Sequence, residues 1–166
     1  MLIGEGIVMD YIIFHYRRNN VNVVFRYLAL SHPENGSLEL SMLQSMLESF
    51  FSIFVVVAVC SGKGVIVGDI ISDNELFITD IGFGHSAKPN MMFAANVFPF
   101  DKFYMTSGAV LPIPGSLFKE KIDSIIDKFY KDDNELTPNQ EAAFAAQVIR
   151  AALQDGVIAK MKYIDV

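Results

Sequence analysis

Residues 50–60 read FFSIFVVVAVC, the longest apolar stretch of the chain, and this stretch decides the fold class. Only Ser52 interrupts it, and residues 53–59 are β-branched or aromatic apart from Ala58. Such side chains favour strands, and a run without alternation is typical of a strand buried on both faces. The stretch has about half of the roughly 20 residues that a membrane-spanning helix needs. We therefore predict a central β-strand and no membrane span.

Shorter apolar segments continue this pattern towards the C-terminus. Their composition or alternation favours strands, which we predict at residues 53–60, 65–71, 75–81, 91–98 and 103–111. Turn-forming residues separate most of them, and residues 82–90 are predicted as a longer loop. Five short strands joined by tight turns indicate a small, strongly bent antiparallel sheet or barrel.

Helical patterns precede the predicted sheet. Residues 10–18 suit either a strand or a helix, but residues 21–30 carry apolar side chains at helical spacing. Ser37 is expected to cap a further helix, whose apolar stripe ends at Phe50. We therefore predict an N-terminal helical segment at residues 1–50.

The last part of the chain is also predicted to be helical. Residues 118–129 place apolar and charged side chains on different faces, and residues 137–140 (TPNQ) are typical of a helix start. Gly156 is expected to end that helix, and the tail at 157–166 would add a strand or dock on a neighbour. The predicted fold is α+β in one compact unit. It has N-terminal helices at 1–50, a small five-stranded antiparallel barrel-like sheet at 51–114 and C-terminal helices at 115–166.

Composition restricts the class of protein. The 166 residues are 52% hydrophobic and 19% charged, which excludes a disordered chain and suffices for one core. A single cysteine, Cys60, excludes an internal disulfide and fits a reducing compartment. Glu5 and Asp10 stand where a signal peptide would carry basic residues. We therefore expect a cytoplasmic protein.

Five short motifs resemble a module of uncharacterised bacterial proteins, several of which end in a SEC-C zinc-binding motif. The motifs are SFFSIF at 49–54, GKGV at 62–65, DIIS at 69–72, FITD at 77–80 and FYMTSG at 103–108. The resemblance covers about Asp10 to Pro114, and it implies helices leading into a small β-barrel but no activity. A SEC-C tail needs several cysteines and a histidine, and only Cys60 is present. We therefore expect no zinc by that route, and no metal or cofactor is assigned.

The richest polar cluster of the sequence is the predicted loop from Asp80 to Lys88. A hydrolase would need Ser86 activated by His85 and that base oriented by Asp80. A metal site on Asp80 and His85 would need a further ligand, for which the candidates are Asp69 and Glu75. Neighbouring side chains diverge, so we favour a connecting loop with solvated polar groups and assign no catalytic residue. A small hydrolase or ligand-binding enzyme using Asp80–Lys88 is kept as the alternative.

Nucleic-acid binding is disfavoured by charge. The net charge is −6, and residues 51–112 hold three lysines against five acidic residues and no arginine. An adaptor for nucleic acid or for a nucleic-acid-binding protein, the third alternative, would need Lys63, Lys88, Lys102 and Arg17 on one face.

The apolar content points to a partner. Eight methionines and fourteen phenylalanines are more than a monomer of this size needs to bury, and soluble monomers seldom expose large apolar patches. The expected faces are the alanine-rich last helix and residues 90–100, whose interface candidates are Met91, Met92, Phe93, Phe98 and Phe100. Most soluble oligomers are symmetric, so a homodimer is the simplest form. The leading prediction is a non-enzymatic interaction module that self-associates.

Overall fold

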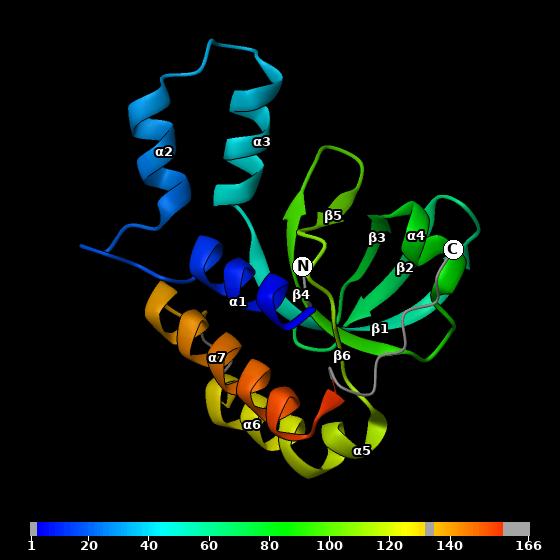
Figure 1. Ribbon diagram of the computed structural model, residues 1–166. Helices are drawn as coiled ribbons and strands as arrows, with labels where there is room; N and C mark the ends of the chain where they lie inside the picture. The colour runs from blue at the N-terminus through cyan, green and yellow to red at the C-terminus, as the bar shows by residue number, and fades with distance from the viewer. Residues whose placement is uncertain (1–2, 132–134, 158–166) are drawn as a thin grey trace.

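The computed structural model describes residues 3–131 and 135–157. At its centre is a small closed barrel, which helices precede and follow in the chain (Figure 1). The barrel closes in the strand order β1-β2-β3-β5-β4, because β4 pairs with β1 as well as with β5. A short sixth strand, β6, pairs with β4. The strands are β1 (Phe50–Cys60), β2 (Gly64–Asp69), β3 (Glu75–Thr79), β4 (Met92–Pro99), β5 (Tyr104–Thr106) and β6 (Leu111–Pro112).

The α+β class is confirmed, but the sheet is mixed and not purely antiparallel as predicted. β3 and β5 run parallel where Ile78 meets Tyr104, whereas the other pairings among the described strands are antiparallel. The single strand predicted at 103–111 is also wrong, since it is divided into β5 and the start of β6. Gly108, with a φ of +89°, turns the chain between them, and its N–H donates to the hydroxyl of Thr106.

The central stretch forms β1 as predicted, and part of it is buried on both faces. Phe51 and Ile53 contribute to the core under the helices, whereas Phe54 and Val56 contribute to the core inside the barrel. This double burial explains the unbroken apolar run. The strand begins at Phe50, a residue expected in the preceding helical stripe.

Helices account for most of the remaining chain. The ambiguous residues 10–18 begin inside a helix that ends at Phe14, and the caps predicted at Ser37 and Thr137 are confirmed by their side-chain hydrogen bonds. Gly156 follows the last helix at a φ of +69°. The tail predicted at 157–166 lies outside the described residues except for Val157. The helices are α1 (Ile3–Phe14), α2 (Val23–Ser31), α3 (Leu38–Leu47), α4 (Ile81–Ser86), α5 (Gly115–Leu117), the π-helical turn η1 (Phe118–Ile122), α6 (Asp123–Tyr130) and α7 (Pro138–Gln154).

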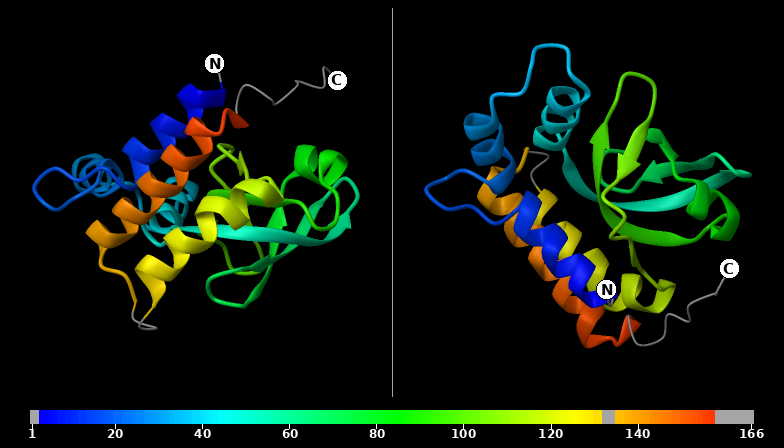
Figure 2. Two further views of the ribbon diagram at one scale, coloured as in Figure 1. Left: turned by 90° about the horizontal axis from the view of Figure 1, so that it is seen from below. Right: turned by 45° about the horizontal axis from the view of Figure 1, so that its top comes forward.

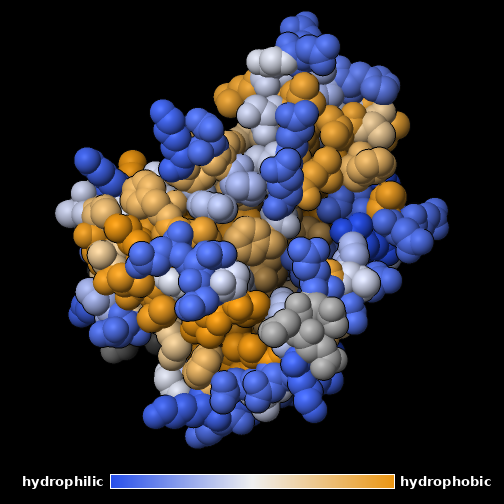
Figure 3. Space-filling view, turned by 180° about the vertical axis from the view of Figure 1, so that it is seen from behind, coloured by the Kyte–Doolittle hydropathy of each residue, from blue (hydrophilic) through white to orange (hydrophobic). Residues whose placement is uncertain are grey.

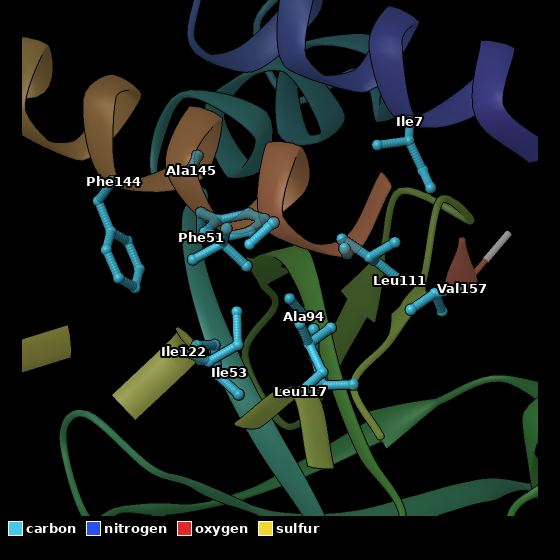
Figure 4. Packing of buried hydrophobic residues seen from close by; sticks show 14 residues of the cluster. Ile7, Phe51, Ile53, Ala94, Leu111, Leu117, Ile122, Phe144, Ala145 and Val157 are labelled. Carbon is cyan, nitrogen blue, oxygen red and sulfur yellow. The ribbon is translucent and has the colours of Figure 1, made fainter. Parts of the chain in front are cut away.

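The larger hydrophobic core lies between the barrel and a layer of helices. Helices α1 and α7 run beside each other across the barrel, with α6 next to α7 (Figures 1 and 2). Side chains from α1, β1 and α7, among them Ile7, Phe51 and Phe144, meet in this core (Figure 4). The core therefore joins residues from all three segments predicted from the sequence.

Helices α2 and α3 pack on each other and stand apart from this layered body (Figures 1 and 2). We call residues 23–47 the arm. None of its described residues belongs to either of the two main hydrophobic clusters. Its attachments include the buried side chains of Val24 and Leu43 and a hydrogen bond from the hydroxyl of Ser45 to the carbonyl of Pro99.

In the part of the chain that the structure describes, none of the helices has both the length and the apolar character that a membrane crossing requires.

Candidate interaction surface and buried polar network

The predicted polar loop contains a short helix, which fixes two of its four candidate residues. The carboxylate of Asp80 accepts the N–H of Phe83 at 2.8 Å and thereby caps α4. The hydroxyl of Ser86 donates to the carbonyl of Gly82 at 3.0 Å. His85 and Lys88 are exposed. The hydrogen bonds of Asp80 and Ser86 thus serve the α4 backbone, and the prediction of a loop was wrong because it missed this cap.

Replacing Asp80 by alanine is expected to lower the free energy of unfolding by about 1 kcal/mol, the usual cost of losing a helix N-cap. Urea denaturation monitored by circular dichroism measures this loss. Asp127→Ala, on an exposed position of α6, is the matched control. A loss no larger than that of the control would contradict the capping role.

The proposed additional metal ligands are also held elsewhere. Asp69 is buried and accepts hydrogen bonds from the hydroxyls of Ser52 and Ser72 and from the N–H of Ile71, so it organises the turn after β2. Glu75 is exposed at the start of β3. Among residues 3–131 and 135–157, no three His, Cys, Asp or Glu side chains gather as a metal site would require.

The basic residues needed for a nucleic-acid adaptor are spread over the molecule. Lys63 and Lys88 belong to segments next to α4, where the carbonyl of Lys63 accepts the N–H of Asp80. Lys102 belongs to the turn between β4 and β5, and Arg17 to the segment after α1. These two segments lie away from α4, and the one after α1 is on the opposite side of the barrel from it (Figure 1). The structure does not bring these four residues together.

Residues 90–100, the predicted interface segment, belong largely to the core. Phe93 packs against Phe54 and Phe83 inside the barrel, and Phe98 stacks on Phe14 of α1. Both are buried because β4 is paired on two sides and covered on both faces, so neither side chain forms a free surface. Met92 and Phe100 are half-buried, and Met91 is exposed.

The exposed apolar side chains are concentrated in the N-terminal helices instead. Of the thirteen large hydrophobic residues that are exposed in the described chain, nine lie between Val8 and Leu38. The most exposed are Leu30, at 81%, and Leu38, at 78%, close to the end of the arm. The arm residues of this set are Val23, Phe25, Tyr27, Leu30 and Leu38. Hydrophobic side chains also appear among hydrophilic ones on the face seen from behind (Figure 3).

The sequence contained a signal for this surface. The helix from Val23 to Ser31 reads VVFRYLALS, and it carries apolar residues on more than one side. A helix with apolar residues on more than one face has to pack against more than one apolar surface to bury them all. In the structure its inner side chain Val24 is buried, and the rest of its apolar surface is only partly covered by α3.

A buried polar network connects α1 to the barrel. The side-chain amide of Asn96, on β4, donates from Nδ2 to Oδ2 of Asp10 at 2.7 Å. Its Oδ1 lies 2.8 Å from Nε2 of His15, which therefore holds a proton and donates it. All three residues are buried. Sequence reasoning missed this network; the available signal was a polar residue within each of two apolar segments.

Burial perturbs both ionisable members of this network. It raises the pKa of Asp10, an effect that hydrogen bonds from Asn96 and Ser107 oppose. It lowers the pKa of His15 to about 4, which the hydrogen bond to Asn96 opposes and the positive charge of Arg17 reinforces. At neutral pH His15 is therefore uncharged.

A half-buried acid, Glu141, lies on α7 beside this network. Glu141 accepts the N–H of Phe51 at 3.1 Å, and the ring of Phe51 lies edge-on to His15. Burial raises the pKa of Glu141, and burial together with Glu141 and Asp69 raises the pKa of Tyr130 to about 12. These contacts fix α7 and α1 on β1.

A model of a family of unknown function (DUF7986) matches residues 4–147, which include the arm, the barrel, all of α1 but its first residue and most of α7. No curated protein and no solved structure matches the chain. The family match confirms the prediction of an uncharacterised module, and it gives no support to a SEC-C resemblance.

Proposed function

The chain belongs to this family of unknown function, and from that premise we propose that it is a non-enzymatic interaction module that self-associates through the arm. The observation that carries the proposal is the exposure of Leu30 and Leu38 beside other apolar side chains of α2. Burying a leucine contributes about 1.5–3 kcal/mol, so a folded chain that leaves these exposed gains by covering them. We also propose that the protein acts in the bacterial cytoplasm and that it is related to the uncharacterised SEC-C-containing proteins that it resembles.

A second copy of the chain is the occupant that fits this surface best. The arm exposes five large apolar side chains, which can supply the apolar centre of a symmetric interface. It carries only Arg26, Glu34 and Glu39 as charged residues, so two arms approach with little repulsion despite the net charge of −6. A twofold axis would place the same apolar patch on both sides of the interface.

The double substitution Leu30→Glu, Leu38→Glu replaces two apolar side chains of the proposed interface by carboxylates. It is expected to weaken the binding free energy by at least about 1.4 kcal/mol, which corresponds to a tenfold weaker self-association. Both side chains are exposed in the single chain, so the variant is expected to fold normally. Light scattering over a dilution series measures the change in the dissociation constant.

Ile81→Glu is the matched control, since Ile81 is an equally apolar side chain, 68% exposed, on α4 and far from the arm (Figure 1). The control is expected to associate like the wild type. Equal association of all three proteins would refute the arm as the interface.

A further inference from the structure

We propose that the polar network of Asp10, Asn96 and His15 is a latch that holds α1 on the barrel at neutral pH and opens on acidification while the barrel stays folded. This inference concerns the attachment of α1 and does not depend on self-association through the arm.

The latch lies in the middle of the face that α1 presents to the barrel. Ile7, one turn before Asp10, is buried in the larger core, and Phe14, one turn after it, stacks on Phe98 at 6.1 Å. Asp10 lies between these two apolar contacts and His15 directly follows α1, and both bond the same amide, that of Asn96. One side chain of β4 thus makes two of the polar contacts that hold α1.

The amide of Asn96 can satisfy both partners in only some protonation states. Its Nδ2 needs an acceptor, which the carboxylate of Asp10 supplies, and its Oδ1 needs a donor, which the neutral imidazole supplies from Nε2. A protonated Asp10 still has a carbonyl oxygen that accepts from Nδ2. Protonation of Asp10 is therefore compatible with the closed latch.

Protonation of His15 is not compatible with it. The second proton goes to Nδ1, and it places a positive charge on a buried side chain, which is only 6% exposed. The rings of Tyr11, at 5.5 Å, and Phe51, at 5.8 Å, occupy two sides of the imidazole. The ionisable groups around the imidazole are Asp10, Tyr11 and Arg17 from α1 and the residues after it, and Glu141 from α7.

These surrounding groups do not compensate a charged imidazole. Arg17 disfavours it by its own charge, and Asn96 on β4 and Phe51 on β1 are uncharged. Asp10 is linked to His15 through the amide of Asn96, and burial raises the pKa of Asp10, so acidification also neutralises this carboxylate. Glu141 uses Oε1 to accept the N–H of Phe51, and burial raises its pKa, so acidification also neutralises it. Moving α1 away lets His15 be protonated in water.

Opening α1 requires fewer broken contacts than opening the barrel. The outer side chains Val8, Met9 and Ile12 are about half exposed, at 42–50%, so they lose less buried surface than core side chains do. In contrast, β1 is paired with β4 from Phe50 to Val55 and with β2 along its other edge. Regions with few buried contacts open locally at lower free energy than the whole domain.

Amide hydrogen exchange at about pH 7.5 and about pH 4.5, corrected for the intrinsic pH dependence of exchange, tests the latch. We expect the protection of α1 to fall at least tenfold more than that of β1 on acidification. Parallel loss of protection in α1 and β1, or no loss in α1, would overturn the proposal from the wild type alone.

The variant His15→Gln separates the latch from a general effect of acid. Its amide can still donate to Asn96 but cannot take a second proton, so α1 should keep its protection at the lower pH. Asp10→Asn leaves His15 in place and should still open. Carrying out the exchange in the Leu30→Glu, Leu38→Glu background removes any contribution of the arm, so failure of the latch and failure of the proposed dimer are distinguishable.

Discussion

Phe144→Ala is expected to lower the free energy of unfolding by about 3–5 kcal/mol, the cost of truncating a buried aromatic side chain. Phe144 on α7 is fully buried, and its ring packs against those of Phe51, Phe129 and Tyr130 at 5.3–5.9 Å. Three elements thus meet on one ring, and neighbours on β1 and α6 cannot all move inward to fill the cavity. The helical layer therefore depends on this residue.

Urea denaturation of the variant and of Phe25→Ala measures the difference. Phe25 lies on the exposed side of the arm, and its truncation is expected to change the free energy of unfolding by no more than about 0.5 kcal/mol in a monomer. A loss below about 1.5 kcal/mol for Phe144→Ala would mean that α7 is not anchored as described.

The largest pH effect is expected from His15. Its pKa is about 4 in the folded chain against 6.5 ordinarily, so between these values the unfolded chain binds more protons than the folded one. Stability therefore falls as the pH falls through this window. Relative to His15→Gln, the wild type is expected to lose about 3 kcal/mol between about pH 7.5 and about pH 4 if α1 stays closed, and less once α1 opens and His15 is protonated without unfolding of the barrel.

The opposite sign is expected for Asp10, whose folded-state pKa is raised by burial. Here the folded chain binds more protons, so the wild type gains stability relative to Asp10→Asn as the pH falls. Urea denaturation of the three proteins at each pH measures both trends, and His85→Gln controls for removal of an exposed imidazole. A difference between the wild type and His15→Gln that stays constant with pH would contradict the buried, uncharged His15.

The fold was predictable where local physics determines it. The β-branched run of β1 specifies a strand buried on both sides, and Ser37, Thr137 and Gly156 mark helix ends by their own hydrogen bonding or backbone freedom. The parallel contact of Ile78 with Tyr104 could not be predicted, because strand order depends on contacts distant in the sequence. The capping of α4 by Asp80 was missed because its two glycines suggested a loop.

The site was less predictable than the fold. Asp80, His85 and Ser86 are close in sequence, but one helical turn directs the hydrogen bonds of Asp80 and Ser86 to the backbone. Asp10 and Asn96 are distant in sequence, and only the packing of α1 on β4 joins them. Likewise, the excess of apolar residues was evident from composition. Which of them are exposed depends on the fold, because β4 is enclosed between neighbouring strands of the barrel, whereas apolar side chains of the arm stay exposed.

The mass of the wild-type chain in solution, followed by light scattering or sedimentation equilibrium over a dilution series, tests the central claim most directly. Self-association through the arm predicts twice the chain mass of 18.5 kDa at high concentration and a reversible fall towards 18.5 kDa on dilution. A mass of 18.5 kDa at every concentration, with the chain folded, would contradict it.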